Sequence, residues 1–138
     1  MISDDVKFYD KRQSDQIKKL LDNFPISGSI GYSSRSFFTT INSEETKSEL
    51  ALVCISIKNT IYIFDARDLR NDNYFRTVIQ KVFLKKGLEV IVYDLDHELK
   101  ALQESLKLGL RKDGIYDVYD LSDPDYKDMT FERLTEKL

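Results

Sequence analysis

Residues 50–64 read Leu-Ala-Leu-Val-Cys-Ile-Ser-Ile-Lys-Asn-Thr-Ile-Tyr-Ile-Phe. Two nearly continuous apolar, β-branched runs, 50–57 and 61–64, flank three polar residues at 58–60. Such runs are typical of strands buried inside a sheet, and a polar break of this length joins two strands as antiparallel neighbours. The stretch therefore predicts two central strands connected by a tight hairpin.

Strand and helix patterns alternate on both sides of this hairpin. Before it, the sequence predicts a strand at 7–9, an amphipathic helix at 17–24, a strand at 30–40 and a polar loop at 42–48. After it, the sequence predicts a helix at 75–83 closed by Gly87, a strand at 88–93, a helix at 95–106 stopped by Gly109, a strand at 118–119 and a helix from Thr130 to Leu138. An antiparallel meander followed by βαβ units gives a mixed sheet with helices on both faces, an α/β architecture of the ribonuclease H-like kind.

Length and composition narrow the class of protein. With 138 residues we expect one domain, spanning 1–138. Cys54 and His97 are the sole cysteine and histidine, which excludes an internal disulfide framework and a Cys/His zinc site. No apolar stretch approaches the roughly 20 residues of a membrane span, and the N-terminus lacks a secretory signal. We therefore expect a cytoplasmic or nuclear chain with no membrane partner and no cofactor.

The charge balance argues against a strongly nucleic-acid-binding chain. Lys and Arg number 21 against 24 Asp and Glu, so the formal net charge is −3 and the chain has no overall basic field. Contact with RNA would need a local patch, and the candidates lie between 67 and 86: Arg67, Arg70, Arg76, Lys81, Lys85 and Lys86. The alternative is that these residues form ordinary solvated helix faces and complement the C-terminal helix dipoles.

Acidic residues follow three of the predicted strands, namely Asp65, then Asp94, Asp96 and Glu98, then Asp117 and Asp120. Open α/β sheets bind ligands at the carboxyl ends of parallel strands, and converging carboxylates could hold two catalytic metal ions. The alternative for Asp94 is a helix N-cap followed by acids in the first turn. His97 is interpreted as an exposed surface residue, with a general base as its alternative. Cys54, inside an apolar strand, is expected to carry a buried, protonated thiol.

Several segments match the motifs of a known family in order. Residues 6–9 and 17–21 look like its opening strand and helix, and 29–35 lie where it has an Ile-Gly-x-Asp-x-Glu strand. Residues 92–98 are similar to its second motif, in which Asp follows His-Asp or His-Asn by four positions, and 118–120 to its Val-Phe-Asp-Thr strand. The set, covering 6 to about 123, resembles the DEDD-type 3′-to-5′ exonuclease domain of RNase D, and most closely the branch containing Egalitarian and the Exd-type proteins.

This chain departs from the family at the residues that would bind metal. Ser33 and Arg35 stand where the family has the Asp and Glu of its first motif. Glu98 stands at the second-motif Asp, and the third motif, Tyr-x-x-x-Asp, has no counterpart after Asp120. The resemblance therefore implies a degenerate and truncated domain with no metal site and no catalytic residues.

We accordingly expect a catalytically inactive exonuclease-like domain. It would act as a protein-interaction adaptor in RNA metabolism or small-RNA pathways, with weak RNA contact through the 67–86 surface. A helix face or a sheet edge would bind the partner, and could also support a homodimer. One alternative is an active metal-dependent 3′-5′ exoribonuclease using Asp65, Asp94, Asp96 and Glu98. Another is a small-molecule or receiver-like module, which predicts a strictly parallel sheet.

Overall fold

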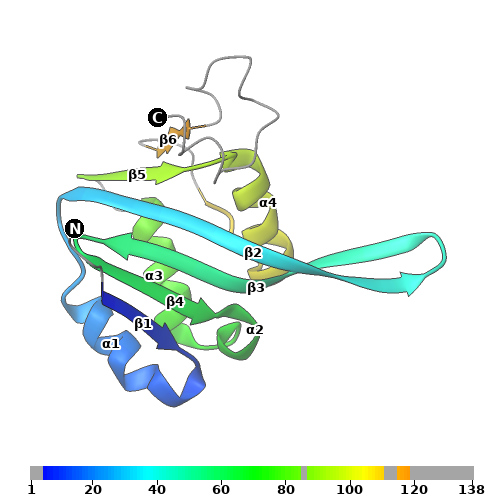
Figure 1. The fold of residues 1–138 in the computed structure, drawn as a ribbon, viewed down its shortest axis with the longest axis horizontal. Coiled ribbons are helices and arrows are strands. Elements are labelled where there is room, and N and C mark those ends of the chain that lie inside the picture. The colour runs from blue at the N-terminus through cyan, green and yellow to red at the C-terminus, as the bar shows by residue number, and fades with distance from the viewer. Residues whose placement is uncertain (1–4, 85–86, 111–114, 119–138) are drawn as a thin grey trace.

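The computed structural model describes residues 5–84, 87–110 and 115–118. Its centre is one six-stranded sheet in the order β1-β4-β3-β2-β5-β6 (Figure 1). The strands are β1 (Asp5–Tyr9), β2 (Gly28–Asn42), β3 (Glu45–Ile57), β4 (Thr60–Asp65), β5 (Leu88–Val92) and β6 (Ile115–Asp117). The hairpin of residues 50–64 thus forms two adjacent inner strands, as predicted.

The sheet is mixed. Strands β2, β3 and β4 pair antiparallel in sequence order, whereas β1 joins β4, β5 joins β2, and β6 joins β5 in parallel. This is the predicted combination of a meander with crossover units, which parallel strands require. The antiparallel pairs exclude the strictly parallel sheet of the receiver-like alternative.

The helices are α1 (Ser14–Asp22), α2 (Ala66–Leu69), α3 (Asn73–Leu84) and α4 (Leu95–Leu106), with a short 3₁₀ turn η1 (Lys11–Gln13) before α1. Figure 1 shows α3 behind the central strands. Phe75 of α3 packs on Phe64 of β4 with ring centroids 5.3 Å apart, and Phe83 meets Tyr32 of β2 at 4.9 Å. The core lies between the helices and this face of the sheet, which we call the covered face.

The other face, which we call the open face, is not covered by any helix of the described residues. The strand registers align one row of side chains across all six strands on it, namely Val6, Ile61, Ser56, Gly31, Ile91 and Tyr116. Val6 is 61% exposed and Tyr116 is 49% exposed. Flanking helices are therefore confirmed, but within the described residues they lie on one face and not on both.

Strands β2 and β3 continue past the rest of the sheet as a two-stranded ribbon over residues 36–50, which projects to the right in Figure 1. Pairing reaches Asn42 opposite Glu45, so the prediction of a loop at 42–48 was wrong. Most polar residues of the ribbon are exposed, and the segment shows no apolar alternation, which is the usual signal for a strand.

Some predicted boundaries also change. Helix α4 ends at Leu106, where Lys107 takes a left-handed backbone with φ 58°, and not at Gly109. The last described strand covers 115–117 and ends before Val118, while Tyr119 and the predicted helix at 130–138 lie outside the described residues. Gly87 has φ 90°, the left-handed conformation expected there. No helix in the described part is long and apolar enough to cross a membrane.

Candidate functional site

The first turn of α4 lies at the carboxyl ends of β5 and β6, where the sequence predicted a ligand site. Asp94 is the N-cap, and its carboxylate accepts a hydrogen bond from the His97 backbone N–H at 3.4 Å. Asp117, at the end of β6, accepts from the backbone N–H groups of Asp94 and Leu95, both at 2.8 Å. These two carboxylates satisfy helix N-terminal donors that would otherwise lack partners. The N-cap interpretation of Asp94 is confirmed.

Glu98, which also lies in the first turn of α4, is the buried acid of this region. Its side chain is 6% exposed and accepts a hydrogen bond from the hydroxyl of Ser34 on β2. Burial raises the pKa of Glu98 above its usual value, while the Ser34 hydrogen bond and the nearby His97 oppose that shift. The environment therefore favours the protonated carboxyl, since a charge is costly to bury without full hydrogen bonding.

Tyr32 lies on the same face of β2 as Ser34, because successive strand side chains alternate between faces. It is 3% exposed, and its hydroxyl has no hydrogen-bond partner among the described residues. Burial, and then the nearby Glu98 carboxyl, raise the pKa of Tyr32. Tyr32, Ser34 and Glu98 form one buried polar group, which we call the Glu98 cluster.

Ser33 and Arg35, the positions matched to the family's first motif, lie on the open face and are exposed. Ser33 stands opposite Cys54 of β3 and hydrogen-bonds its thiol, which lowers the pKa of that thiol less than burial raises it. Cys54 is half-buried and not fully buried, because its strand is covered on one face only. The structure thus brings Ser34 and Tyr32 to Glu98, whereas Ser33 and Arg35 lie on the opposite face of β2.

Asp65 does not join the other candidate acids. Strands β3 and β2 separate β4 from β5, so the ends of β4 and β5 are roughly 14 Å apart at about 4.8 Å per strand. The Asp65 carboxylate instead accepts from the Asp68 backbone N–H at 3.1 Å and caps α2. Within residues 5–84, 87–110 and 115–118, no three acidic, His or Cys side chains are grouped so that they could hold a metal ion.

The four candidate RNA-binding residues that the structure describes, Arg67, Arg70, Arg76 and Lys81, do not form one basic surface. Arg67 and Arg70 line a cavity of about 430 Å³, but Glu49, Asp68 and Glu104 line it as well. The Arg67 guanidinium lies over the Phe37 ring, 4.4 Å from its centroid.

On α3, Arg76 donates to the Arg70 carbonyl at 3.1 Å. Lys81 is five positions further along the helix and projects from another side of it, because each residue advances about 100°. Lys85 and Lys86 lie outside the described residues. The described part of the 67–86 surface is therefore mixed in charge.

Sequence reasoning missed a second group of cations. Lys7, Lys19 and Lys58 line a cavity of about 420 Å³ between α1 and the strands β1, β3 and β4. These lysines are far apart in the sequence, and no motif connects them. Only the pairing of β1 with β4 brings them together.

Solved structures share this arrangement of strands and helices. RNase D of Trypanosoma brucei in complex with GMP superposes with a TM-score of 0.64 at 18% identity, over 83% of this chain and 33% of that one. The Nibbler EXO domain of Aedes aegypti gives 0.68 at 15% identity, over 84% of this chain and 54% of that one. This chain has the fold of the RNase D-type exonuclease domains. Escherichia coli RNase D, described as an exoribonuclease involved in structured RNA processing, gives 0.64 at 8% identity over 99% of this chain and 33% of that one.

The likeness to the exonuclease domains is one of fold. The chain spans about a third to a half of the length of these structures. No protein-family model and no curated protein matches the sequence. The predicted ribonuclease H-like architecture is confirmed, and Glu98 lies in the first turn of the helix after β5, where the second-motif resemblance was noted.

Proposed function

We propose that this chain is an exonuclease-fold domain that binds a partner without hydrolysing RNA. The carrying observation is that β2, from Gly28 to Asn42, contains no acidic residue on either face. Two-metal phosphoryl transfer needs several carboxylates around ions about 4 Å apart. The group that contacts Glu98 from β2 is the hydroxyl of Ser34, with the Tyr32 side chain nearby, and hydroxyls are far weaker ligands for a divalent cation than carboxylates.

The burial of Glu98 and its raised pKa support the same proposal. A metal ligand must be deprotonated, whereas burial favours the protonated form of this carboxyl. The neighbouring carboxylates of Asp94 and Asp117 already accept backbone N–H donors at the start of α4. The acids of this region therefore serve to hold the helix against the sheet.

A protein partner fits the surface better than RNA does. The open face exposes large apolar side chains, including Phe8 at 52% and Ile91 at 42%, and such groups mark protein contacts. The described basic residues of the 67–86 surface are mixed with acids, and the chain is acidic overall. We place the domain in RNA metabolism, as an adaptor in RNA-processing or small-RNA pathways, with a homodimer as a second way of covering the open face.

Manganese titration by calorimetry tests the proposal at its metal-binding step. The wild-type chain and the Glu98→Gln variant should both give no binding heat at millimolar metal. Saturable binding that the Glu98→Gln variant loses would favour the alternative, an active metal-dependent 3′-5′ exoribonuclease with an unusual carboxylate set. Glu104→Gln, on the exposed side of the same helix, is the matched control.

A further inference from the structure

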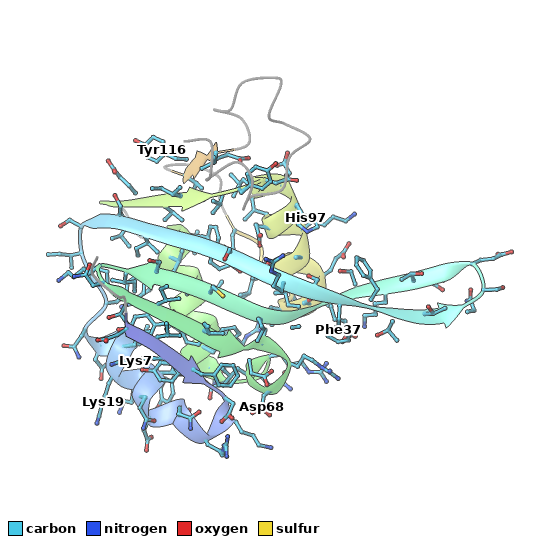
Figure 2. The ribbon with its side chains drawn as sticks, viewed as in Figure 1. Lys7, Lys19, Phe37, Asp68, His97 and Tyr116 are labelled. Atoms are coloured by element: carbon cyan, nitrogen blue, oxygen red, sulfur yellow. The ribbon has the colours of Figure 1, made fainter. Side chains whose placement is uncertain are left out.

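The lysine-lined cavity lies on the covered face at the sheet edge opposite the Glu98 cluster. The cavity reaches the β3–β4 turn through its lining residues Ile57, Lys58 and Thr60, at the end of the sheet where β4 begins. Glu98 lies near the other end, where β5 leads into α4. Lys7 comes from β1, directly opposite Tyr62 of β4, and Lys19 comes from α1. Figure 2 labels Lys7 and Lys19 on these two elements, one above the other.

The charge of this cavity is of one sign. Three lysines line it and no acidic side chain does. Lys7, Lys19 and Lys58 make no ion pair with any described residue, whereas Lys11, Lys47 and Lys100 each pair with a carboxylate. All three lysines are exposed, and their ammonium groups give the cavity a local positive potential that favours an anion.

The other residues that line the cavity indicate which kind of molecule carries the anionic group. The half-buried Tyr62 forms one side, its ring centroid 5.9 Å from that of Tyr9, and the buried Tyr9 and Ile57, each 8% exposed, form the floor beside it. A volume of about 420 Å³ is too large for phosphate alone and falls within the roughly 300–1,000 Å³ of small-molecule sites. The cavity therefore combines cations for an anionic group with aromatic and apolar contacts for a flat body.

We propose that this cavity binds a phosphate-bearing ligand with a flat ring system, a mononucleotide unit, whose phosphate contacts Lys7, Lys19 and Lys58 and whose ring packs against Tyr62. The unit could come from a free nucleotide or from the 5′-phosphorylated end of an RNA strand, since both present the same chemistry. The site lies away from Glu98 and is independent of whether the chain hydrolyses RNA.

The test is calorimetric titration with four probes, namely uridine monophosphate, uridine, inorganic phosphate and 5′-phosphorylated triuridylate. The wild-type chain should bind uridine monophosphate and should bind uridine at least tenfold more weakly. Inorganic phosphate should compete. Lys19→Gln should weaken binding about tenfold, because a hydrogen bond to a charged group is lost. Lys58→Asn should act in the same way, and asparagine tolerates the left-handed backbone of that position, φ 54°.

Lys18→Gln is the matched control, because Lys18 is exposed on the same helix but does not line the cavity. Its affinity for uridine monophosphate should equal that of the wild type, and all variants should unfold at the wild-type temperature. Binding of triuridylate as well as the monophosphate would support the site with a strand end as its source, and binding of the monophosphate alone would support a free nucleotide. No binding of uridine monophosphate, equal binding of uridine, or equal weakening by Lys18→Gln would overturn the proposal.

Discussion

The hydroxyl of Ser34 on β2 donates a hydrogen bond to Oε2 of Glu98 on α4. This contact joins the strand to the first turn of the helix through a carboxyl that is 6% exposed. Because burial raises the pKa of Glu98, the proton stays on this carboxyl to a higher pH than on an exposed glutamate. Glu98 therefore connects two elements of the fold, and its chemistry is that of a buried acid.

Glu98 should make stability depend on pH. Its pKa in the folded chain is raised, so the folded state holds the proton more tightly than the unfolded state does. The free energy of unfolding should then fall as pH rises from the usual glutamate value of 4.5 through the raised pKa. Glu98→Gln, which cannot titrate, should show a flatter dependence in urea unfolding across this range. Equal slopes for the two proteins would contradict the account, and Glu104→Gln should keep the wild-type slope.

Removal of the Ser34 hydroxyl should destabilise the fold. Ser34→Ala leaves the buried Glu98 carboxyl without the Ser34 hydroxyl that donates to it, at a cost of about 1–3 kcal/mol in the free energy of unfolding. Ser33→Ala changes the adjacent, exposed residue on the open face and should cost less than about 0.5 kcal/mol. Denaturant unfolding of both variants measures the difference. If Ser33→Ala costs as much as Ser34→Ala, the assignment of faces is wrong.

The base of the ribbon should depend on Arg67. Its guanidinium lies over Phe37, and an exposed cation–π contact contributes about 0.5–1 kcal/mol. Arg67→Gln should therefore speed proteolytic cleavage within residues 36–50, while Arg70→Gln, on the same segment but away from the Phe37 ring, should not. A double-mutant cycle of Arg67→Gln with Phe37→Leu should give a coupling energy of that size. Zero coupling would exclude the contact.

Two glycines should respond differently to alanine. Gly87 has φ 90°, and a Cβ there would lie 2.8 Å from the carbonyl oxygen of Ile26. Gly31 has an ordinary backbone, and its Cβ would lie 3.5 Å from that of Ser56, in normal contact. Gly87→Ala should lower the free energy of unfolding by about 1–3 kcal/mol, and Gly31→Ala should be nearly neutral. Thermal unfolding distinguishes the two, and equal melting temperatures would contradict the backbone described for Gly87.

The sequence predicted those elements whose apolar pattern is set by the core. Residues 50–57 and 61–64 are continuous apolar runs, and 75–83 and 95–106 repeat with the period of a helix facing the sheet. The ribbon at 42–48 was missed because both of its sides face water, so no alternation marks it. The single covered face was missed because the open face still carries apolar residues such as Val6 and Phe8.

The site was predicted in part. The N-cap role of Asp94 follows from local chemistry and could be found in the sequence. Motif spacing matched Ser33 and Arg35 to the family's first-motif acids and did not single out Ser34, the β2 residue that contacts Glu98. Every second residue of a strand faces the same side, and Ile30 and Tyr32 are buried. Counting on from them places Ser34 on the covered face. The grouping of Lys7, Lys19 and Lys58 depends on long-range strand pairing and has no local signal.

The most direct test of the central claim is incubation of the chain with 5′-labelled single-stranded RNA and manganese, beside an active exoribonuclease as a positive control. Because β2 offers Glu98 hydroxyls and no carboxylate, the RNA should remain full length for the wild type and for Glu98→Gln alike. Shortening from the 3′ end that the wild type performs and Glu98→Gln abolishes would contradict the account and make the chain an enzyme.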